Sequence, residues 1–256
     1  MASLNRPTFS IVSITFRDLP GLKKTINSVL YQTFEDYEWI VIDGNSGVEV
    51  CSFLSGISDH RLKWVSESDS GIFDAMNKGL SMATGEYVVF LNGGDVFASP
   101  DTLESVAKFK SDDADLIYGD CVLVFENGDE HHKPARSHKT IWYGMFANHQ
   151  AMFFRRIQTI GLRFREELKV AGDYCFTAEF LKRCKLVQNA PFIVTRFDMT
   201  GVSNTSQHQG RIENWVVQRD VLLMSFPARL VVRLAYLASA VGRQHFKRLY
   251  SKWMYQ

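Results

Sequence analysis

The chain has 256 residues, of which 46% are hydrophobic and 22% are charged, and its 29 Lys and Arg residues against 28 Asp and Glu residues give a net charge of +1. This composition is ordinary for a globular protein and excludes an intrinsically disordered or collagen-like chain. The near balance of charge argues against a protein that coats nucleic acid electrostatically, so we expect no nucleic-acid partner.

The first 95 residues predict four strands, the first three of them followed by helices. Each strand is rich in β-branched or aromatic residues, and the apolar residues of the helices recur at helical spacing. The predicted strands are residues 9–16, 37–42, 61–65 and 86–91, and the clearest helix spans residues 72–83. This alternation predicts an α/β fold with a doubly wound, mostly parallel sheet, whose first half is Rossmann-like.

The loops after the four strands share one edge of the predicted sheet, where folds of this class bind their ligands. These loops are residues 15–18, 43–46, 67–74 and 92–95. Asp, Asn and Gly make good turns, so each loop taken alone has a purely structural interpretation. Four such loops on one edge favour a ligand site.

Two features strengthen this interpretation. Asp74, Asn77 and Lys78 form a polar stripe on the helix after the third strand, although a solvated helix face has the same pattern. Asp95 follows two glycines after an apolar strand, where backbone can approach a phosphate and a carboxylate can hold Mg²⁺ or Mn²⁺. No dinucleotide-binding, P-loop, G-x-S-x-G or H-E-x-x-H motif offers another site.

A resemblance to a known family rests on five segments. They are SIVSITF at 10–16, VIDGNS at 41–46, SDSGIFDAMNKG at 68–79, ATGEYVVFLNGGD at 83–95 and VAGDYCF at 170–176. Together they resemble the inverting family-two glycosyltransferases of the GT-A fold, and within that family the colanic-acid and related exopolysaccharide enzymes. The resemblance covers roughly residues 8–205, and residues 69–95 are its most specific part.

The resemblance implies a site for a nucleotide-sugar donor, with UDP or GDP as the nucleotide. Thr15 and Asp43 would hold the base and the ribose. Asp74, Asn77 and Lys78 would line the same pocket.

The resemblance also implies a divalent cation, Mg²⁺ or Mn²⁺, at Asp95, which matches the last acid of the family's D-x-D-like element. Asn92, Gly93 and Gly94 would adjoin the donor diphosphate. Asn92 and Gly94 stand at positions that are often acidic in the family. The cation would therefore have one protein carboxylate and rely on diphosphate oxygens and water.

Asp173 matches the catalytic base of the family. An acceptor hydroxyl must lose its proton as it attacks, and one carboxylate must face the sugar from the side opposite the leaving group. The alternative is that Asp173 only caps the helix predicted from Tyr174 onward.

Two further segments are candidates for the acceptor side of the site. Gly201, Val202 and Ser203 look like the family's loop near the diphosphate and the acceptor, and His149 and Gln150 are candidates for the acceptor site itself. A buried, hydrogen-bonded histidine with no role in binding is the alternative for His149.

We divide the chain into a GT-A domain over residues 1–220 and a tail over residues 221–256. The domain comprises a nucleotide-sugar half, about 8–120, and an acceptor half, about 121–220. The tail contains six Lys and Arg and no Asp or Glu, and on a helix four of these cations would share one face: Arg229, Arg233, Arg243 and Lys247. We expect a basic amphipathic helix that either contacts the inner face of the cytoplasmic membrane or packs on protein.

The leading hypothesis is an inverting, metal-dependent hexosyltransferase of bacterial surface-polysaccharide synthesis, acting on a polyprenyl-linked saccharide. Four widely spaced cysteines without a C-x-x-C pair, and no apolar segment after the N-terminus, favour a cytoplasmic location, with peripheral contact to the membrane. The alternatives are a sugar nucleotidyltransferase and a non-catalytic subunit that binds sugar nucleotides.

Overall fold

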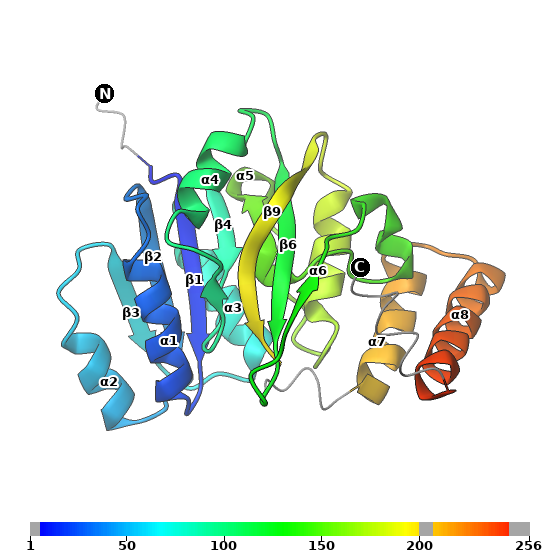
Figure 1. Cartoon of the computed structure of the whole chain (residues 1–256), viewed down its shortest axis with the longest axis horizontal. Coiled ribbons are helices and arrows are strands. Elements are labelled where there is room, and N and C mark those ends of the chain that lie inside the picture. The colour runs from blue at the N-terminus through cyan, green and yellow to red at the C-terminus, as the bar shows by residue number, and fades with distance from the viewer. Residues whose placement is uncertain (1–5, 200–206, 246–256) are drawn as a thin grey trace.

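The fold is described by a computed structural model over residues 6–199 and 207–245. Within these residues, nine strands form one sheet with helices on both faces, and the last two helices stand at one end of it (Figure 1). The strands are β1 (Phe9–Thr15), β2 (Tyr37–Asp43), β3 (Leu62–Ser66), β4 (Tyr87–Phe90), β5 (Val96–Phe97), β6 (Leu116–Val124), β7 (Glu130–Lys133), β8 (Met152–Arg155) and β9 (Val187–Asp198). The helices are α1 (Leu19–Leu30), α2 (Val48–Ser55), α3 (Ile72–Met82), α4 (Thr102–Phe109), α5 (Arg156–Thr159), α6 (Gly172–Leu181), α7 (Gln207–Asp220) and α8 (Phe226–His245), with 3₁₀ turns η1 (His138–Tyr143) and η2 (His149–Ala151).

The first half of the sheet is parallel, in the order β3-β2-β1-β4. Thr15 at the end of β1 lies opposite Asp43 at the end of β2, and Asp43 lies opposite Ser66 at the end of β3. The carboxyl ends of these strands therefore share one edge, which brings their polar terminal residues together. This arrangement confirms the predicted α/β class.

The second half of the sheet is mixed. Beyond β4 the order continues β8-β6-β9-β5, and β7 pairs with β6. β8 runs antiparallel to both β4 and β6, whereas β6 and β9 are parallel. The predicted parallel order holds only as far as β4, because β8 enters beside β4 in the opposite direction.

Apolar side chains cover both faces of the sheet, since successive residues of a strand point to opposite sides. On one face Ile11 belongs to a core that includes Leu22 of α1. On the other face Val12 belongs to a core that includes Met76 of α3 and Phe176 of α6. These two cores fix the strand ends, and with them the loops that carry the candidate site.

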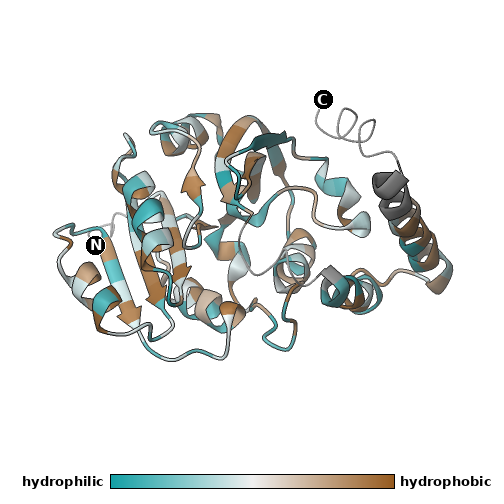
Figure 2. Ribbon diagram, turned by 60° about the horizontal axis from the view of Figure 1, so that its bottom comes forward, coloured by the Kyte–Doolittle hydropathy of each residue, from teal (hydrophilic) through white to brown (hydrophobic). Residues whose placement is uncertain are grey.

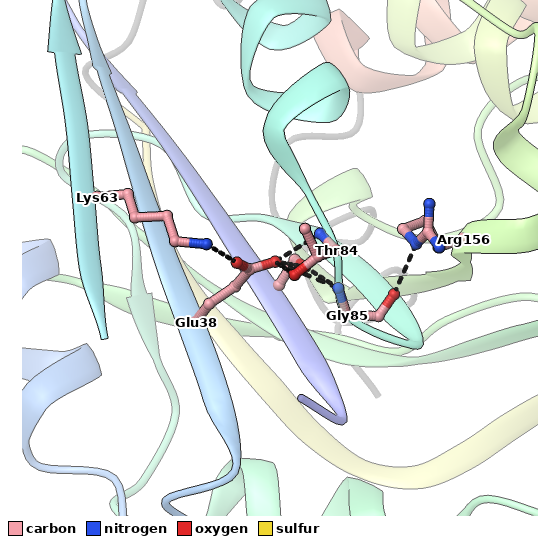
Figure 3. Close-up of polar contacts among 6 residues, drawn as sticks. Glu38, Lys63, Thr84, Gly85 and Arg156 are labelled. Carbon is pink, nitrogen blue, oxygen red and sulfur yellow. Dashed lines mark hydrogen bonds and ion pairs between the residues drawn. The ribbon is translucent and has the colours of Figure 1, made fainter. Parts of the chain in front are cut away.

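A buried carboxylate joins the amino ends of the parallel strands (Figure 3). Glu38 of β2 accepts hydrogen bonds from the Ser10 hydroxyl at 2.6 Å, from the Thr84 backbone N–H at 2.6 Å and from the Gly85 N–H at 3.2 Å. Lys63 of β3 pairs with its other oxygen at 2.7 Å. Burial alone would raise the pKa of Glu38, but Lys63 and these hydrogen bonds outweigh burial and lower it. The ion pair and hydrogen bonds therefore stabilise the ionised form.

The two C-terminal helices pack against each other through a buried arginine. The Arg229 guanidinium of α8 lies 4.6 Å from the ring centroid of Trp215 on α7, and its side chain is buried. Val232 is also buried, and the Tyr236 ring stacks on Tyr143 at 4.7 Å. The tail thus packs on protein along this face. The prediction that Arg229 lies on a cationic face exposed to solvent or lipid is wrong, because Trp215 covers its guanidinium group.

The opposite side of α8 exposes apolar residues, and Figure 2 shows their hydrophobic bands along the helix. These residues are Leu230, Val231, Leu234 and Leu237. No helix in the described ranges is both long enough and apolar enough to span a membrane.

Candidate active site

Asp43 lies at the centre of the edge formed by the parallel strands. Its Oδ2 atom accepts hydrogen bonds from the Ser46 backbone N–H at 3.0 Å and from the Ser66 hydroxyl at 2.6 Å, which fix the carboxylate. Its Oδ1 atom is buried and has no hydrogen-bond partner among the described residues. Thr15 ends the neighbouring strand and is also buried. The pair predicted to hold the nucleotide is therefore adjacent, and Asp43 keeps one acceptor available.

The polar stripe predicted on α3 divides into two environments. Lys78 donates a hydrogen bond to the Ser68 carbonyl at 2.8 Å and pairs with Glu67 at 3.0 Å and Asp74 at 3.4 Å. The Ser70 backbone N–H, followed by Lys78, lowers the pKa of Asp74 despite its partial burial. These contacts fasten the loop between β3 and α3.

Asn77 faces another part of the molecule. Its amide donates to the Phe164 carbonyl at 2.9 Å and accepts from the Phe164 N–H at 2.8 Å. Both amide atoms therefore tie α3 to the segment before α6. The predicted contacts of Asp74, Asn77 and Lys78 with a donor remain predictions.

The loop at residues 92–95 is held by a hydroxyl from α1. Thr25 donates to the Asp95 carbonyl at 2.8 Å and accepts from the Gly94 N–H at 3.0 Å. Gly94 has a φ of 97°, which disfavours residues with a Cβ atom. The Gly93 N–H donates to the Ile14 carbonyl of β1 at 2.9 Å. The two glycines thus keep Asp95 close to the end of β1.

Asp95 is a buried carboxylate that is 4% exposed. It accepts a hydrogen bond from the Gln150 amide at 2.9 Å and one from the Asp198 backbone N–H at 3.0 Å. Burial raises its pKa to about 7, although the Asp198 N–H, the charge of His149 and the Gln150 amide act in the opposite direction. The Asp198 carboxylate adds to the rise. Within the protein, the negative charge of Asp95 is therefore poorly compensated.

Asp173 is joined to the same cluster through His149. The His149 Nδ1 atom lies 3.3 Å from Asp173 Oδ2, and Asp173 Oδ1 accepts a hydrogen bond from the Tyr174 N–H at 2.7 Å. Asp173 lies in the first turn of α6, whose N-cap is Ala171. Asp173 is therefore not the N-cap residue, although its carboxylate accepts from one N–H of the first turn. Consecutive residues His149 and Gln150 connect the predicted base with the predicted metal ligand.

Buried polar atoms without partners gather at this edge, whereas buried polar groups in proteins normally have a hydrogen-bond partner. Of nine such side-chain atoms in the described residues, five belong here, so this edge has unused hydrogen-bonding capacity. They are Asp43 Oδ1, Asn92 Oδ1, Asn148 Nδ2, His149 Nε2 and Gln150 Oε1.

The chemistry of these residues fits a divalent cation. Mg²⁺ and Mn²⁺ prefer carboxylate and carbonyl oxygens, and Asp95, with the neighbouring Asp198 and the unpartnered Asn92 Oδ1, offers that kind of atom. No cluster of three or more His, Cys, Asp or Glu residues with metal-binding geometry occurs in the part of the chain that the structure describes. The protein alone would thus make a weak site, completed by oxygens of the donor.

Sequence reasoning missed two residues of this site. Asp198 ends β9, and only an acid at the end of an apolar strand could have signalled it. Thr25 lies within α1, and nothing in its sequence environment indicates the contact with residues 94 and 95. Gly201, Val202 and Ser203 lie outside the described residues.

The sequence model of Glycosyl transferase family 2 matches residues 10–182. The chain is similar to a PGL/p-HBAD biosynthesis glycosyltransferase of Mycobacterium bovis, with 30% identity over 249 residues, 89% of this chain and 88% of that protein.

Two solved structures share the fold. A fragment of Staphylococcus aureus TarS in complex with UDP-GlcNAc has a TM-score of 0.70 at 19% identity, over 84% of this chain and 66% of that one. The mannosyltransferase PcManGT of Pyrobaculum calidifontis, in complex with GDP-Man and Mn²⁺, has a TM-score of 0.61 at 15% identity, over 97% of this chain and 83% of that one. Because the family match spans more than half of the sequence, the chain belongs to glycosyltransferase family 2, and it has the GT-A fold.

Proposed function

We propose that the protein transfers a sugar from a nucleotide diphosphate to a saccharide acceptor, with inversion at the anomeric carbon and Asp173 as the general base. The observation that carries this proposal is the link from Asp173 through His149 and Gln150 to Asp95 at the edge of the sheet. In this proposal, the base for the attacking hydroxyl and the site for the leaving diphosphate belong to one cluster. Membership of the family supports the same reaction class.

Asp173 takes the proton in this reaction. Its carboxylate is 23% exposed, so an acceptor hydroxyl can approach it, while His149 and the Tyr174 N–H restrict its orientation. The hydroxyl oxygen attacks the anomeric carbon as its proton moves to Asp173, and the bond to the diphosphate breaks on the opposite face. A single displacement of this kind inverts the anomeric centre.

Asp43 and Thr15 bind the nucleotide in this proposal. The buried, unpartnered Oδ1 of Asp43 can accept a hydrogen bond from an N–H of the base or from a ribose hydroxyl. UDP- and GDP-sugars are the candidate donors, in keeping with the two solved complexes of the same fold. Gly93 and Gly94, in turn, would let the backbone approach the diphosphate.

Asp95 would hold the divalent cation, together with oxygens of the donor diphosphate. When bound, the cation supplies Lewis-acid neutralisation of charge on the departing diphosphate. The high pKa of Asp95 and the unpartnered atoms of Asn92 and Gln150 support this assignment.

The acceptor and the setting form a finer proposal. We assign the enzyme to bacterial surface-polysaccharide synthesis with a polyprenyl-linked acceptor, and the M. bovis relative named for PGL/p-HBAD biosynthesis supports the broader role in glycan assembly. The colanic-acid subgroup rests on the sequence motifs alone. We place the enzyme in the cytoplasm with α8 against the inner face of the membrane, supported by its exposed apolar side and the absence of acidic residues after Asp220.

The reaction is tested with UDP- and GDP-sugars, aryl glycoside acceptors and Mn²⁺, and NMR reports the anomeric configuration of the product. We expect inversion, and a kcat that falls about 10²- to 10⁴-fold in Asp173→Asn with donor affinity unchanged. Asp120→Asn is the matched control, because Asp120 forms a similar pair with His132, at 2.7 Å, between β6 and β7. Retention of configuration, or equal losses in both variants, would contradict the proposal.

Membrane contact is tested by flotation of the full chain with anionic phospholipid vesicles. Leu234→Glu places a charge on the exposed side of α8 and should abolish flotation. Ile157→Glu is the control, since Ile157 is an equally exposed apolar residue on α5. Equal flotation of the two variants would argue for protein packing as the role of α8.

A further inference from the structure

The Glu213 carboxylate of α7 binds the backbone of residues 169–171, the loop that precedes the predicted base Asp173. Glu213 accepts a hydrogen bond from the Lys169 backbone N–H at 2.9 Å on one oxygen. Its other oxygen accepts from the N–H groups of Val170 and Ala171, both at 2.8 Å. The Gln209 amide donates to the first oxygen at 2.8 Å. Four donors therefore saturate this carboxylate, which is 4% exposed.

Close packing, in addition to the hydrogen bonds of Glu213, holds α7 against this loop. A Cβ atom at Gly210 would approach Val170 Cγ1 to 3.1 Å, so glycine there lets α7 lie close to the loop. At Gly172, the first residue of α6 after the loop, a Cβ atom would come within 2.6 Å of the Phe73 ring on α3. The loop therefore packs closely on α7, its junction with α6 packs closely on α3, and Glu213 fixes the loop backbone.

The position of this loop decides where Asp173 points. Ala171 is the N-cap of α6, and Asp173 stands two residues later in the first turn, so a shift of the loop moves the carboxylate. Ala171 has no capping side chain of its own. Glu213, from another helix, accepts instead from the N-cap N–H and from the two N–H groups before it, and so holds the backbone that leads into α6.

Burial would raise the pKa of Glu213, but the Ala171 N–H, Gln209 and the other loop N–H groups lower it. The ionised carboxylate is therefore the form that the site stabilises. Asp173 touches neither Glu213 nor Gln209 in the contacts of the described residues, so any influence on the reaction passes through the backbone of the loop.

We infer that Glu213 is a positioning residue, which fixes residues 169–171 so that the Asp173 carboxylate is held in the geometry for proton removal. This inference rests on the proposed function, because it assigns Glu213 a part in the work of Asp173. A displacement of about 1 Å in a reacting group can lower the rate of an enzyme about 10²-fold. Loss of the hydrogen bonds from residues 169–171 to Glu213 therefore lowers kcat and leaves the donor site at residues 15, 43 and 95 unchanged.

The test compares Glu213→Gln with Val217→Ala. Glu213→Gln keeps the shape and one acceptor oxygen but removes the charge and turns an N–H₂ group toward backbone N–H groups, so the hydrogen bonds on one side of the carboxylate are lost. Val217 is buried one turn further along α7, in the apolar cluster that also contains Ala171, and its side chain forms no hydrogen bonds, so Val217→Ala reports the cost of weaker packing alone. We expect kcat to fall 10- to 100-fold in Glu213→Gln, with KM for the donor within twofold, and to change less than twofold in Val217→Ala.

Hydrogen exchange followed by NMR gives a readout that does not need activity. The amides of residues 169–171 should exchange slowly in the wild type, at least tenfold faster in Glu213→Gln, and unchanged in Val217→Ala. Glu213→Asp, which keeps the charge on a shorter side chain, should show intermediate exchange and an intermediate kcat, and it serves if Glu213→Gln does not fold.

Two results would overturn the inference: unprotected amides in the wild type, or equal kcat values for Glu213→Gln and Val217→Ala in an active enzyme. If the wild type transfers no sugar but the amides of residues 169–171 lose protection in Glu213→Gln, the proposed function is rejected, and the role of Glu213 in holding the loop still stands. The two failures are therefore distinguishable.

Discussion

Glu38 and Asp95 are both buried carboxylates of the same sheet, at opposite ends of its parallel strands. Glu38 has an ion pair with Lys63 and donors from the amino ends of the strands, and its pKa is lowered. Asp95 has two hydrogen bonds at the carboxyl end, and its pKa is raised to about 7. Both side chains are almost inaccessible to solvent, but Asp95 is enclosed more deeply by protein, so deeper burial and fewer stabilising partners together raise its pKa.

The comparison separates stability from function along one set of strands. At the amino end, each polar group that leaves water finds a partner within the protein, which is the condition for a net gain in stability. At the carboxyl end, Asp43, Asn92 and Gln150 keep buried atoms that have no partner among the residues the structure describes. Such atoms cost free energy in the unliganded protein, and this cost is recovered when a polar ligand binds.

The largest effect is expected from Asp95→Asn. We expect transfer to fall about 10³-fold, because the cation and the charge on the departing diphosphate lose their protein carboxylate. Mn²⁺ binding in the presence of UDP, measured by calorimetry, should weaken in parallel. At pH 8 the melting temperature of the metal-free variant should equal or exceed that of the wild type, since a poorly compensated charge is removed.

Full activity of Asp95→Asn under limiting Mn²⁺ would show that Asp95 does not hold the cation. A large loss of melting temperature would instead place Asp95 with Glu38, as a structural carboxylate.

The second effect is the loss of stability in Glu38→Ala. The variant leaves the Ser10 hydroxyl and the N–H groups of Thr84 and Gly85 without their acceptor, and we expect the free energy of unfolding to fall by about 3 kcal/mol. Urea denaturation measures this change. The kcat of the folded fraction should stay within twofold of the wild type, and a specific loss of kcat would contradict a purely structural role.

The third effect concerns nucleotide affinity. Asp43→Ala removes a fixed acceptor, and we expect the binding free energy of UDP or GDP to weaken by about 1.5 to 3 kcal/mol in calorimetry. Ser66→Ala removes only the hydroxyl that orients the carboxylate, so its effect should be smaller. Unchanged affinity in Asp43→Ala would show that Asp43 only stabilises the turn at Ser46.

The smallest effect is a pH dependence of stability that belongs to Glu38. Because its pKa is lowered from 4.5 on folding, the native state binds fewer protons than the unfolded state, and stability falls as the pH falls. The contribution is fully present above the unfolded value and is lost as the pH drops through the native pKa. The difference in unfolding free energy between the wild type and Glu38→Gln should therefore be constant above about pH 5 and shrink in more acidic urea titrations. A constant difference down to about pH 3 would contradict the lowered pKa.

The sequence by itself determined the first four strands and their edge. Hydrophobic runs and turn residues predicted residues 9–16 and 37–42, and the structure has β1 at Phe9–Thr15 and β2 at Tyr37–Asp43. The helix predicted over 72–83 is α3, at Ile72–Met82. These signals are local, because strand and helix periods are set by backbone geometry within a few residues. Parallel pairing then placed Thr15, Asp43 and Asp95 at the same end.

Only the tertiary structure decided which distant residues meet. The antiparallel entry of β8 brings His149 and Gln150, just before it, to Asp95 and Asp173. Packing of α7 on the loop before α6 pairs Glu213 with backbone groups more than 40 residues earlier. The burial of the Arg229 side chain likewise depends on the position of Trp215 on the neighbouring helix α7. Such contacts follow from how whole elements pack, since no local period of the sequence encodes the partner of a side chain across the core.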